Sequence, residues 1–181
     1  MIIIFEGSDY TGKTTLSKKL SKVIGVPRLC VNFHDMKRAE SDLDLQEYSA
    51  VSFGTSLGIV ESYNLFHNGV IRDRSYLTEY VYSKLNINGS RETREGFFKT
   101  WIERLKENDY IFILLESDLD DIAKRMKELD DGDIEIEEIG KVKEEYLKVL
   151  EENDLNYLRI DTSKSDIDKC LMDILWEVCY D

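Results

Sequence analysis

The first side chains of the chain that can do chemistry lie in a glycine-containing turn that ends in lysine and threonine. The turn reads Gly7-Ser8-Asp9-Tyr10-Thr11-Gly12-Lys13-Thr14, which fits the spacing G-x-x-x-x-G-K-T. Backbone N–H groups of such a turn converge on phosphate oxygens, the lysine reaches the outer phosphates, and the threonine hydroxyl ligates Mg²⁺. We therefore predict that a nucleoside triphosphate binds here, with Lys13 as a catalytic cation and Thr14 as a metal ligand. The expected contacts to this nucleotide are Gly7, Ser8, Tyr10, Thr11, Gly12, Lys13, Thr14 and Thr15.

A second charged pair, Asp73-Arg74, follows the apolar residues Val70-Ile71. At the carboxyl end of a parallel strand, such a pair lies where ligands bind in open α/β sheets, and it adjoins the glycine turn if the two strands are neighbours. An aspartate there can hold Mg²⁺ or its water, and an arginine can bind a second phosphate with two parallel hydrogen bonds. We predict Asp73 as a metal ligand and both residues as catalytic. Thr78 and Tyr82 follow closely along the chain. We expect both to bind a second substrate, the one that would accept a phosphoryl group.

The elements that position these residues can be predicted from an alternation of short β-rich runs with longer amphipathic stretches. This alternation is typical of strand-helix-strand units around a parallel sheet, so the fold class is predicted as α/β. Helices are expected to begin near Ser117 and Ser165, because a serine oxygen can cap the first N–H groups of a helix. The expected strands are 2–5, 29–33, 69–72, 110–115 and 157–160.

Length and charge narrow the class of protein. The chain has 181 residues, which is the size of one domain, so we expect a single domain over residues 1–181. Its net charge of −13 would repel a polyanion, and we expect no long nucleic acid as a partner. The apolar run at the start covers only Met1 to Phe5, so no membrane segment is expected. Three dispersed cysteines fit a reducing cytoplasm better than a disulfide framework.

The most biased segment runs from residue 128 to residue 138. Seven of its eleven positions are acidic, none is basic, and Gly132 lies in the middle. Such a composition predicts an exposed, mobile connection. Because charged runs are commonly just solvated surface, the segment can equally be a connection without a function.

Taken in order, the motifs resemble those of the thymidylate kinase family of nucleoside monophosphate kinases. The resemblance covers nearly the whole chain and is most specific at the entry to the glycine turn, Phe5-Glu6-Gly7-Ser8-Asp9, and at Asp73-Arg74. It implies a P-loop NTP hydrolase-type fold, with three layers α/β/α, a five-stranded parallel sheet and a short lid at about residues 126–140. It also implies transfer from ATP, with Mg²⁺, to a deoxynucleoside monophosphate similar to dTMP. Relatives suggest a homodimer.

The resemblance assigns roles to matching positions. Asp9 would face the sugar and phosphate of the acceptor, Asp73 would help to place Mg²⁺, and Arg74 would bridge the donor and acceptor phosphates. Arg125 resembles the arginine that stacks on the adenine of ATP at the entrance to the lid.

The chain also departs from the family at several positions. Many members carry an arginine in the loop or the lid that reaches the transferring phosphate, but this chain has Tyr10 in the loop and no basic residue in the acidic segment 128–138 of the lid. After the second strand the family has Arg-Glu-Pro, which is missing. Lys37 and Arg38 follow instead and are expected to hold the acceptor phosphate. Tyr48 and Phe53 are the aromatic candidates for stacking on the acceptor base.

Two alternatives stay open. Deoxynucleoside kinases share the fold and carry a Glu-Arg-Ser close to Asp73-Arg74-Ser75, but they need a carboxylate to take the proton from a sugar hydroxyl. Asp35 is the carboxylate nearest to the expected place and could contact such an acceptor. The second alternative is a nucleotide-binding module without catalysis. A switch GTPase is disfavoured because the chain has no Asn-Lys-x-Asp guanine motif.

Overall fold

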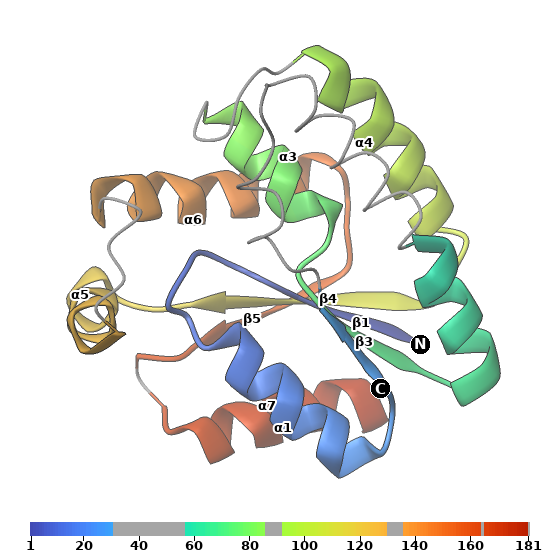
Figure 1. Ribbon diagram of the computed structural model, residues 1–181, viewed down its shortest axis with the longest axis horizontal. Helices are drawn as coiled ribbons and strands as arrows, with labels where there is room; N and C mark the ends of the chain where they lie inside the picture. The colour runs from blue at the N-terminus through green and yellow to red at the C-terminus, as the bar shows by residue number, and fades with distance from the viewer. Residues whose placement is uncertain (31–56, 86–91, 130–135, 164, 181) are drawn as a thin grey trace.

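The computed structural model describes residues 1–30, 57–85, 92–129, 136–163 and 165–180. Within these residues a parallel sheet of five strands has the order β2-β3-β1-β4-β5 (Figure 1). The strands are β1 (Ile2–Glu6), β2 (Arg28–Cys30), β3 (Val70–Asp73), β4 (Tyr110–Glu116) and β5 (Tyr157–Asp161). The paired register sets Phe5 of β1 beside Asp73 of β3. The glycine turn after β1 and the charged pair after β3 are therefore neighbours at one edge of the sheet.

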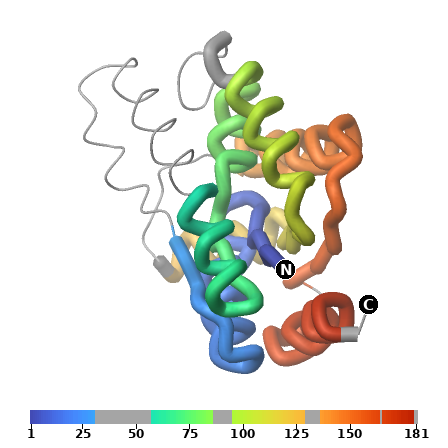
Figure 2. Tube along the Cα trace, turned by 90° about the vertical axis from the view of Figure 1, so that its right-hand side faces the viewer, coloured from blue at the N-terminus to red at the C-terminus, as the bar shows by residue number. Residues whose placement is uncertain are grey.

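Helices cover both faces of the sheet. One face carries α1 (Lys13–Ile24) and α7 (Ile167–Tyr180), and the other carries α3 (Tyr76–Lys84), α4 (Glu92–Leu105) and α6 (Ile136–Glu152), as Figures 1 and 2 show from two sides. Residues 57–67 are also helical, and α5 (Leu119–Leu129) follows β4. Among the described helices, none combines the length and the apolar character that crossing a bilayer requires.

The central strand β1 shows why this sequence forms a sheet that is covered twice. Successive side chains of a strand point to opposite faces. Ile2 and Ile4 pack with residues of α3, α4 and α6, whereas Ile3 and Phe5 pack with α1 and α7. All five residues of β1 are buried, which explains the continuous apolar run rather than an alternating pattern.

The predicted α/β fold with five parallel strands is confirmed, with small shifts of the boundaries. β3 ends at Asp73 rather than one residue earlier. Residues 31–33, expected in the second strand, lie outside the described part. The helix expected at Ser165 begins at Ile167, and Asp166 caps it by accepting the N–H of Lys169 at 2.8 Å. Of the predicted lid at 126–140, residues 126–129 and 136–140 are helical and residues 130–135 lie outside the described part.

Candidate active site

The glycine turn links β1 to α1 and requires glycine at two places. A Cβ on Gly7 would lie 2.2 Å from the carbonyl oxygen of Leu115, and Gly7 has a φ of +133°. Gly12 caps α1 with a left-handed backbone, φ +88°. A side chain at Gly7 would push the turn away from β4, and one at Gly12 would strain the start of the helix. The two glycines therefore allow the turn to lie close against the sheet, with the N-terminus of α1 at its end.

Lys13 is 5% exposed and folds back over this turn. Its amine donates to the carbonyl oxygen of Gly7 at 2.9 Å and to that of Ser8. Burial, together with the nearby Arg74, lowers the pKa of Lys13 to about 7. A charge held in so little water has a strong field, and an anion placed beside it would favour the protonated amine.

Thr14, in the first turn of α1, is in contact with Asp73, at the end of β3. The Thr14 hydroxyl donates to Oδ2 of Asp73 at 2.9 Å, and Asp73 is 1% exposed. This bond uses the hydrogen of the hydroxyl and leaves its lone pairs available. A hydroxyl and a carboxylate are oxygen donors of the kind that Mg²⁺ takes together with phosphate oxygens. The two residues therefore fit a magnesium ion that arrives with a nucleotide.

Asp9 and Arg74, predicted separately, form an ion pair across the site. Arg74 donates to Oδ1 of Asp9, and the Tyr82 hydroxyl donates to Oδ2 at 3.0 Å. Burial would raise the pKa of Asp9, but Arg74 and Lys13 lower it below its ordinary value. Burial and the charge of Asp9 raise the pKa of Tyr82, which therefore stays protonated. The loop and the corner after β3 are thus joined by Asp9, Arg74 and Tyr82, which are side chains expected to contact the acceptor.

The backbone of this corner is held in an unusual conformation. Arg74 has a φ of +66°, which side chains rarely adopt. Its N–H donates to the carbonyl oxygen of Phe5 at 3.0 Å, and its own carbonyl oxygen accepts Nε–H of Arg72 at 3.0 Å. Bonds on both sides therefore fix a left-handed turn that aims the guanidinium at the loop.

Glu6 is a residue of the site whose role sequence reasoning missed. It is fully buried and accepts the N–H of Ser75 at 2.7 Å and the hydroxyls of Ser75 and Thr78 at 2.6 and 2.5 Å. The Tyr146 hydroxyl lies 3.3 Å from it and 2.9 Å from Oγ1 of Thr78. Burial raises the pKa of Glu6 although these hydrogen bonds act in the opposite direction. We call these four residues the Glu6 network.

The Glu6 network changes how Thr78 is understood. The hydroxyl of Thr78 has two partners within the network and the residue is 4% exposed. The binding of the acceptor by Thr78 stays a prediction. The only signal in the sequence was the position of Glu6 between a buried strand and Gly7. Its donors lie 69, 72 and 140 residues away along the chain, so no local pattern could reveal them.

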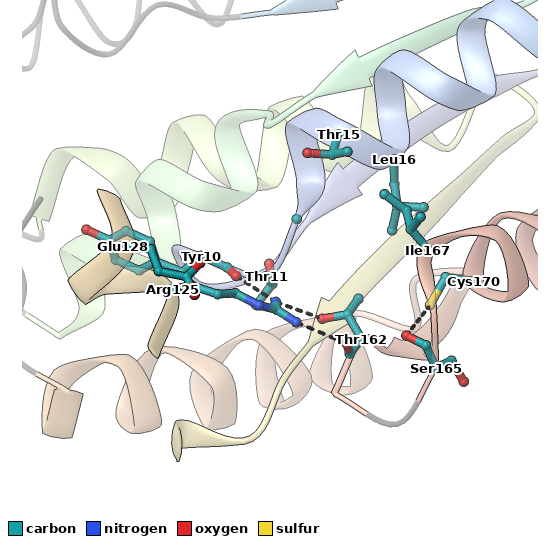
Figure 3. A pocket seen from close by; sticks show the side chains of 11 residues that line it. Tyr10, Thr11, Thr15, Leu16, Arg125, Glu128, Thr162, Ser165, Ile167 and Cys170 are labelled. Carbon is teal, nitrogen blue, oxygen red and sulfur yellow. Dashed lines mark hydrogen bonds between the residues drawn. The ribbon is translucent and has the colours of Figure 1, made fainter. Parts of the chain in front are cut away.

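On the other side of the loop lies a cavity of about 410 Å³ (Figure 3). Its apolar part comes from Leu16, Ile167 and Cys170, and its polar part includes Arg125 and Thr162. Such a mixed lining suits a nucleoside more than a phosphate chain. The loop residues Tyr10, Thr11 and Gly12 and the helix residue Thr15 also line this cavity.

Arg125 holds three segments together at the edge of this cavity. It donates to the carbonyl oxygen of Tyr10 at 2.8 Å and, from its other nitrogen, to the carbonyl oxygen of Thr162 at 3.1 Å. Tyr10 itself has a left-handed backbone with a φ of +63°. Arg125 thus ties α5 to the loop and to the segment after β5 (Figure 3). Stacking on adenine, which the resemblance implied for Arg125, stays a prediction.

The remaining predicted residues of the acceptor site lie outside the described part of the chain. These are Asp35, Lys37, Arg38, Tyr48 and Phe53. Their roles stay predictions.

Comparison with known proteins supports the predicted resemblance. No protein-family model matches the chain. Among curated proteins, the probable thymidylate kinase of Methanocaldococcus jannaschii is 24% identical over 180 residues, covering 97% of this chain and 94% of that protein.

Solved structures give the same picture. The YorR protein of Bacillus subtilis, in complex with phosphorylated GDP, is similar with a TM-score of 0.72 and 26% identity, covering 98% of this chain and 95% of that one. A deoxyadenosine kinase of M. mycoides, with products dCMP and dCDP bound, is similar with a TM-score of 0.73 and 19% identity, covering 98% of both chains. The predicted resemblance to thymidylate kinases and deoxynucleoside kinases is confirmed, and the chain has the fold of these P-loop nucleotide kinases.

Proposed function

We propose that this protein transfers a phosphoryl group from ATP to a deoxynucleoside monophosphate similar to dTMP, giving ADP and the diphosphate. One observation carries the proposal. The phosphate-binding loop and the corner after β3 are joined by two side-chain contacts, Thr14 to Asp73 and Arg74 to Asp9. Donor and acceptor groups held at these two places would lie within reach of one another.

The charges around this junction support binding of two anionic nucleotides. Lys13, Arg28, Arg72 and Arg74 bring four basic side chains near the carboxylates of Asp9, Asp73 and Glu6. The whole chain carries −13, so these basic groups are gathered at one place in a molecule that is acidic overall. Phosphoryl transfer depends on alignment and on neutralising charge, and this cluster can contribute both.

Roles follow for individual side chains. Lys13 would neutralise charge on the transferred group, and Arg74 would hold the acceptor phosphate in line with it. Asp9, kept ionised by Arg74, would accept a hydrogen bond from the acceptor sugar. Mg²⁺ held through Thr14 and Asp73 would neutralise charge on the phosphate oxygens of ATP.

The test is ADP formation with Mg-ATP and a panel of deoxynucleosides and deoxynucleoside monophosphates. ADP formed only with monophosphates supports the proposal, and the product diphosphate is identified by chromatography. Lys13→Met should lower turnover by about a hundredfold or more while the circular dichroism spectrum stays native. Lys18→Met, at an exposed position of the same helix, is the matched control and should keep wild-type turnover.

A second function, phosphorylation of a deoxynucleoside, is favoured by the likeness to the M. mycoides deoxyadenosine kinase and by Ser75 after Asp73-Arg74. In that case ADP would form with nucleosides, and Asp35→Asn would abolish it. If no acceptor gives ADP although ATP binds, the protein is a nucleotide-binding module without catalysis.

A further inference from the structure

Arg28 forms an ion pair with the carboxylate proposed to hold the metal. It lies at the start of the edge strand β2, and one of its terminal nitrogens donates to Oδ2 of Asp73. Its Nε–H donates to the hydroxyl of Ser17 at 2.8 Å. The two side chains of the pair are 15% and 2% exposed, so little water screens the charges. Bonds to two partners fix the orientation of the guanidinium.

The contacts of Arg28 and Thr14 converge on a single oxygen of Asp73. Oδ2 accepts the guanidinium of Arg28, the Thr14 hydroxyl at 2.9 Å and, more weakly, the Ser17 hydroxyl at 3.4 Å. A divalent cation at Thr14 and Asp73 would therefore stand close to the positive charge of Arg28. Like charges at such distances repel, and the repulsion grows as the surroundings become less polar.

The protein ligands available to a lone metal ion are also few. No group of three or more histidine, cysteine, aspartate or glutamate side chains that could hold a metal occurs in the described part of the chain. Asp73 is the one carboxylate that meets Thr14 there, and its charge is already balanced by Arg28. Hard cations need several oxygen ligands, and here the phosphates of a nucleotide would have to supply the others.

We propose that Arg28 is a positioning residue that acts through Asp73 and keeps the affinity of the nucleotide-free protein for a divalent cation low. It holds the carboxylate in place through their hydrogen bond, and it offsets the negative charge that would otherwise attract a free ion. The metal then enters together with the phosphates, whose charge outweighs that of Arg28. The inference rests on the proposed function only in assigning Thr14 and Asp73 to a metal that accompanies ATP.

The test measures binding of Mn²⁺, as a substitute for Mg²⁺, to the nucleotide-free protein by electron paramagnetic resonance of the free ion. Arg28→Gln should bind Mn²⁺ about tenfold more tightly than wild type, because removing a nearby like charge in a poorly screened site has at least this effect. Arg28→Lys keeps the charge and should stay near the wild-type affinity. Arg159→Gln removes an arginine paired with Glu116 instead and should leave the affinity unchanged.

The gained site must also depend on Asp73. Arg28→Gln combined with Asp73→Asn should lose the tighter binding. Arg28→Met, which keeps the aliphatic part of the side chain, replaces Arg28→Gln if the latter does not fold. In either uncharged variant, bound Mn²⁺ should raise the melting temperature more than it does in wild type.

Three results would overturn the inference. These are an unchanged or weaker affinity in the uncharged variants, an equally tight affinity in Arg28→Lys, and a gained site that persists without the Asp73 carboxylate. A purely structural role of Arg28 in holding β2 would lower stability without changing metal affinity. These measurements contain no nucleotide and no transfer step. The proposed function fails separately, when wild type forms no ADP with any acceptor.

Discussion

Arg74 combines a positive charge with a strained backbone, and the two can be separated by substitution. The guanidinium pairs with Asp9, while the main chain at φ +66° is held by bonds to Phe5 and Arg72. Strain of this kind at a corner that carries a charged side chain is common at functional sites. The residue is therefore kept in a costly conformation that directs its charge toward the loop.

We expect Arg74→Gly and Arg74→Ala to lower kcat/KM for the acceptor about a hundredfold, since both remove the charge. They should differ in stability, because glycine adopts a positive φ freely and alanine loses about 1 kcal/mol there. Urea unfolding should thus show the glycine variant to be the more stable of the two. Equal stabilities would contradict the strain, and a loss of ATP affinity alone would contradict the role of the charge.

Glu6 gives a prediction for pH. Its pKa in the folded protein is raised by burial above the ordinary value of 4.5, so the ionised form is less favourable in the folded state than in the unfolded chain. The stability contributed by the protonated carboxyl is complete below about pH 4.5 and is lost as the pH rises through the higher folded pKa.

Glu6→Gln has no carboxyl to ionise, so it does not lose stability as the pH rises, and the glutamine can keep the shape of the Glu6 network. Its free energy of unfolding, relative to wild type, should therefore rise as the pH is raised from about 4.5 through the higher pKa of Glu6 in the folded protein. Urea unfolding of both proteins across this range measures the difference, and Asp109→Asn, at an exposed carboxylate, serves as the control. Parallel pH profiles for wild type and Glu6→Gln would show that Glu6 does not titrate in this way.

At the scale of the elements, Arg125 links α5 to the loop after β1 and to the segment after β5. Arg125→Gln removes these bonds from the border of the cavity beside the loop, where we expect the adenosine of ATP to bind. We expect the KM for ATP to rise about tenfold, with a smaller change in the KM for the acceptor. Lys124→Gln changes the adjacent, exposed residue and is the matched control. An equal rise of both KM values would point to a general loss of folding instead.

Over the whole molecule, charge separates the proposed site from the rest of the surface. The chain has a net charge of −13, and the basic side chains of the proposed site are gathered in one small region. A short anion can therefore bind at the site, whereas the acidic surface around it would repel a long polyanion. We expect no saturable binding of a labelled single-stranded DNA 20-mer in fluorescence anisotropy at roughly 0.1 M salt. Binding of a labelled ATP analogue in the same buffer is the positive control. Saturable DNA binding would mean that the cations extend over a larger surface.

The sequence predicted the features that depend on neighbouring residues or on repeating patterns. The glycine turn is local, and alternating strands and helices indicated a parallel sheet. The contact of Thr14 with Asp73 followed once β1 and β3 were taken as neighbours. Arg28 and Glu6 could not be found in this way. Arg28 meets Asp73 from 45 residues away, and the partners of Glu6 come from α3 and α6, so only packing reveals these contacts.

Two polar contacts lie on either side of the predicted lid at residues 126–140. Arg125, just before the lid, donates to the loop after β1, and Tyr146, beyond its end, belongs to the Glu6 network. Each contact ends on groups that are themselves bonded to the sheet, and breaking a buried polar contact costs about 1–3 kcal/mol. The described residues on either side of the predicted lid are therefore fixed to the two parts of the site proposed to align the phosphates. A substitution that breaks either contact would act on the reaction centre from its periphery, through the loop after β1 or through the Glu6 network.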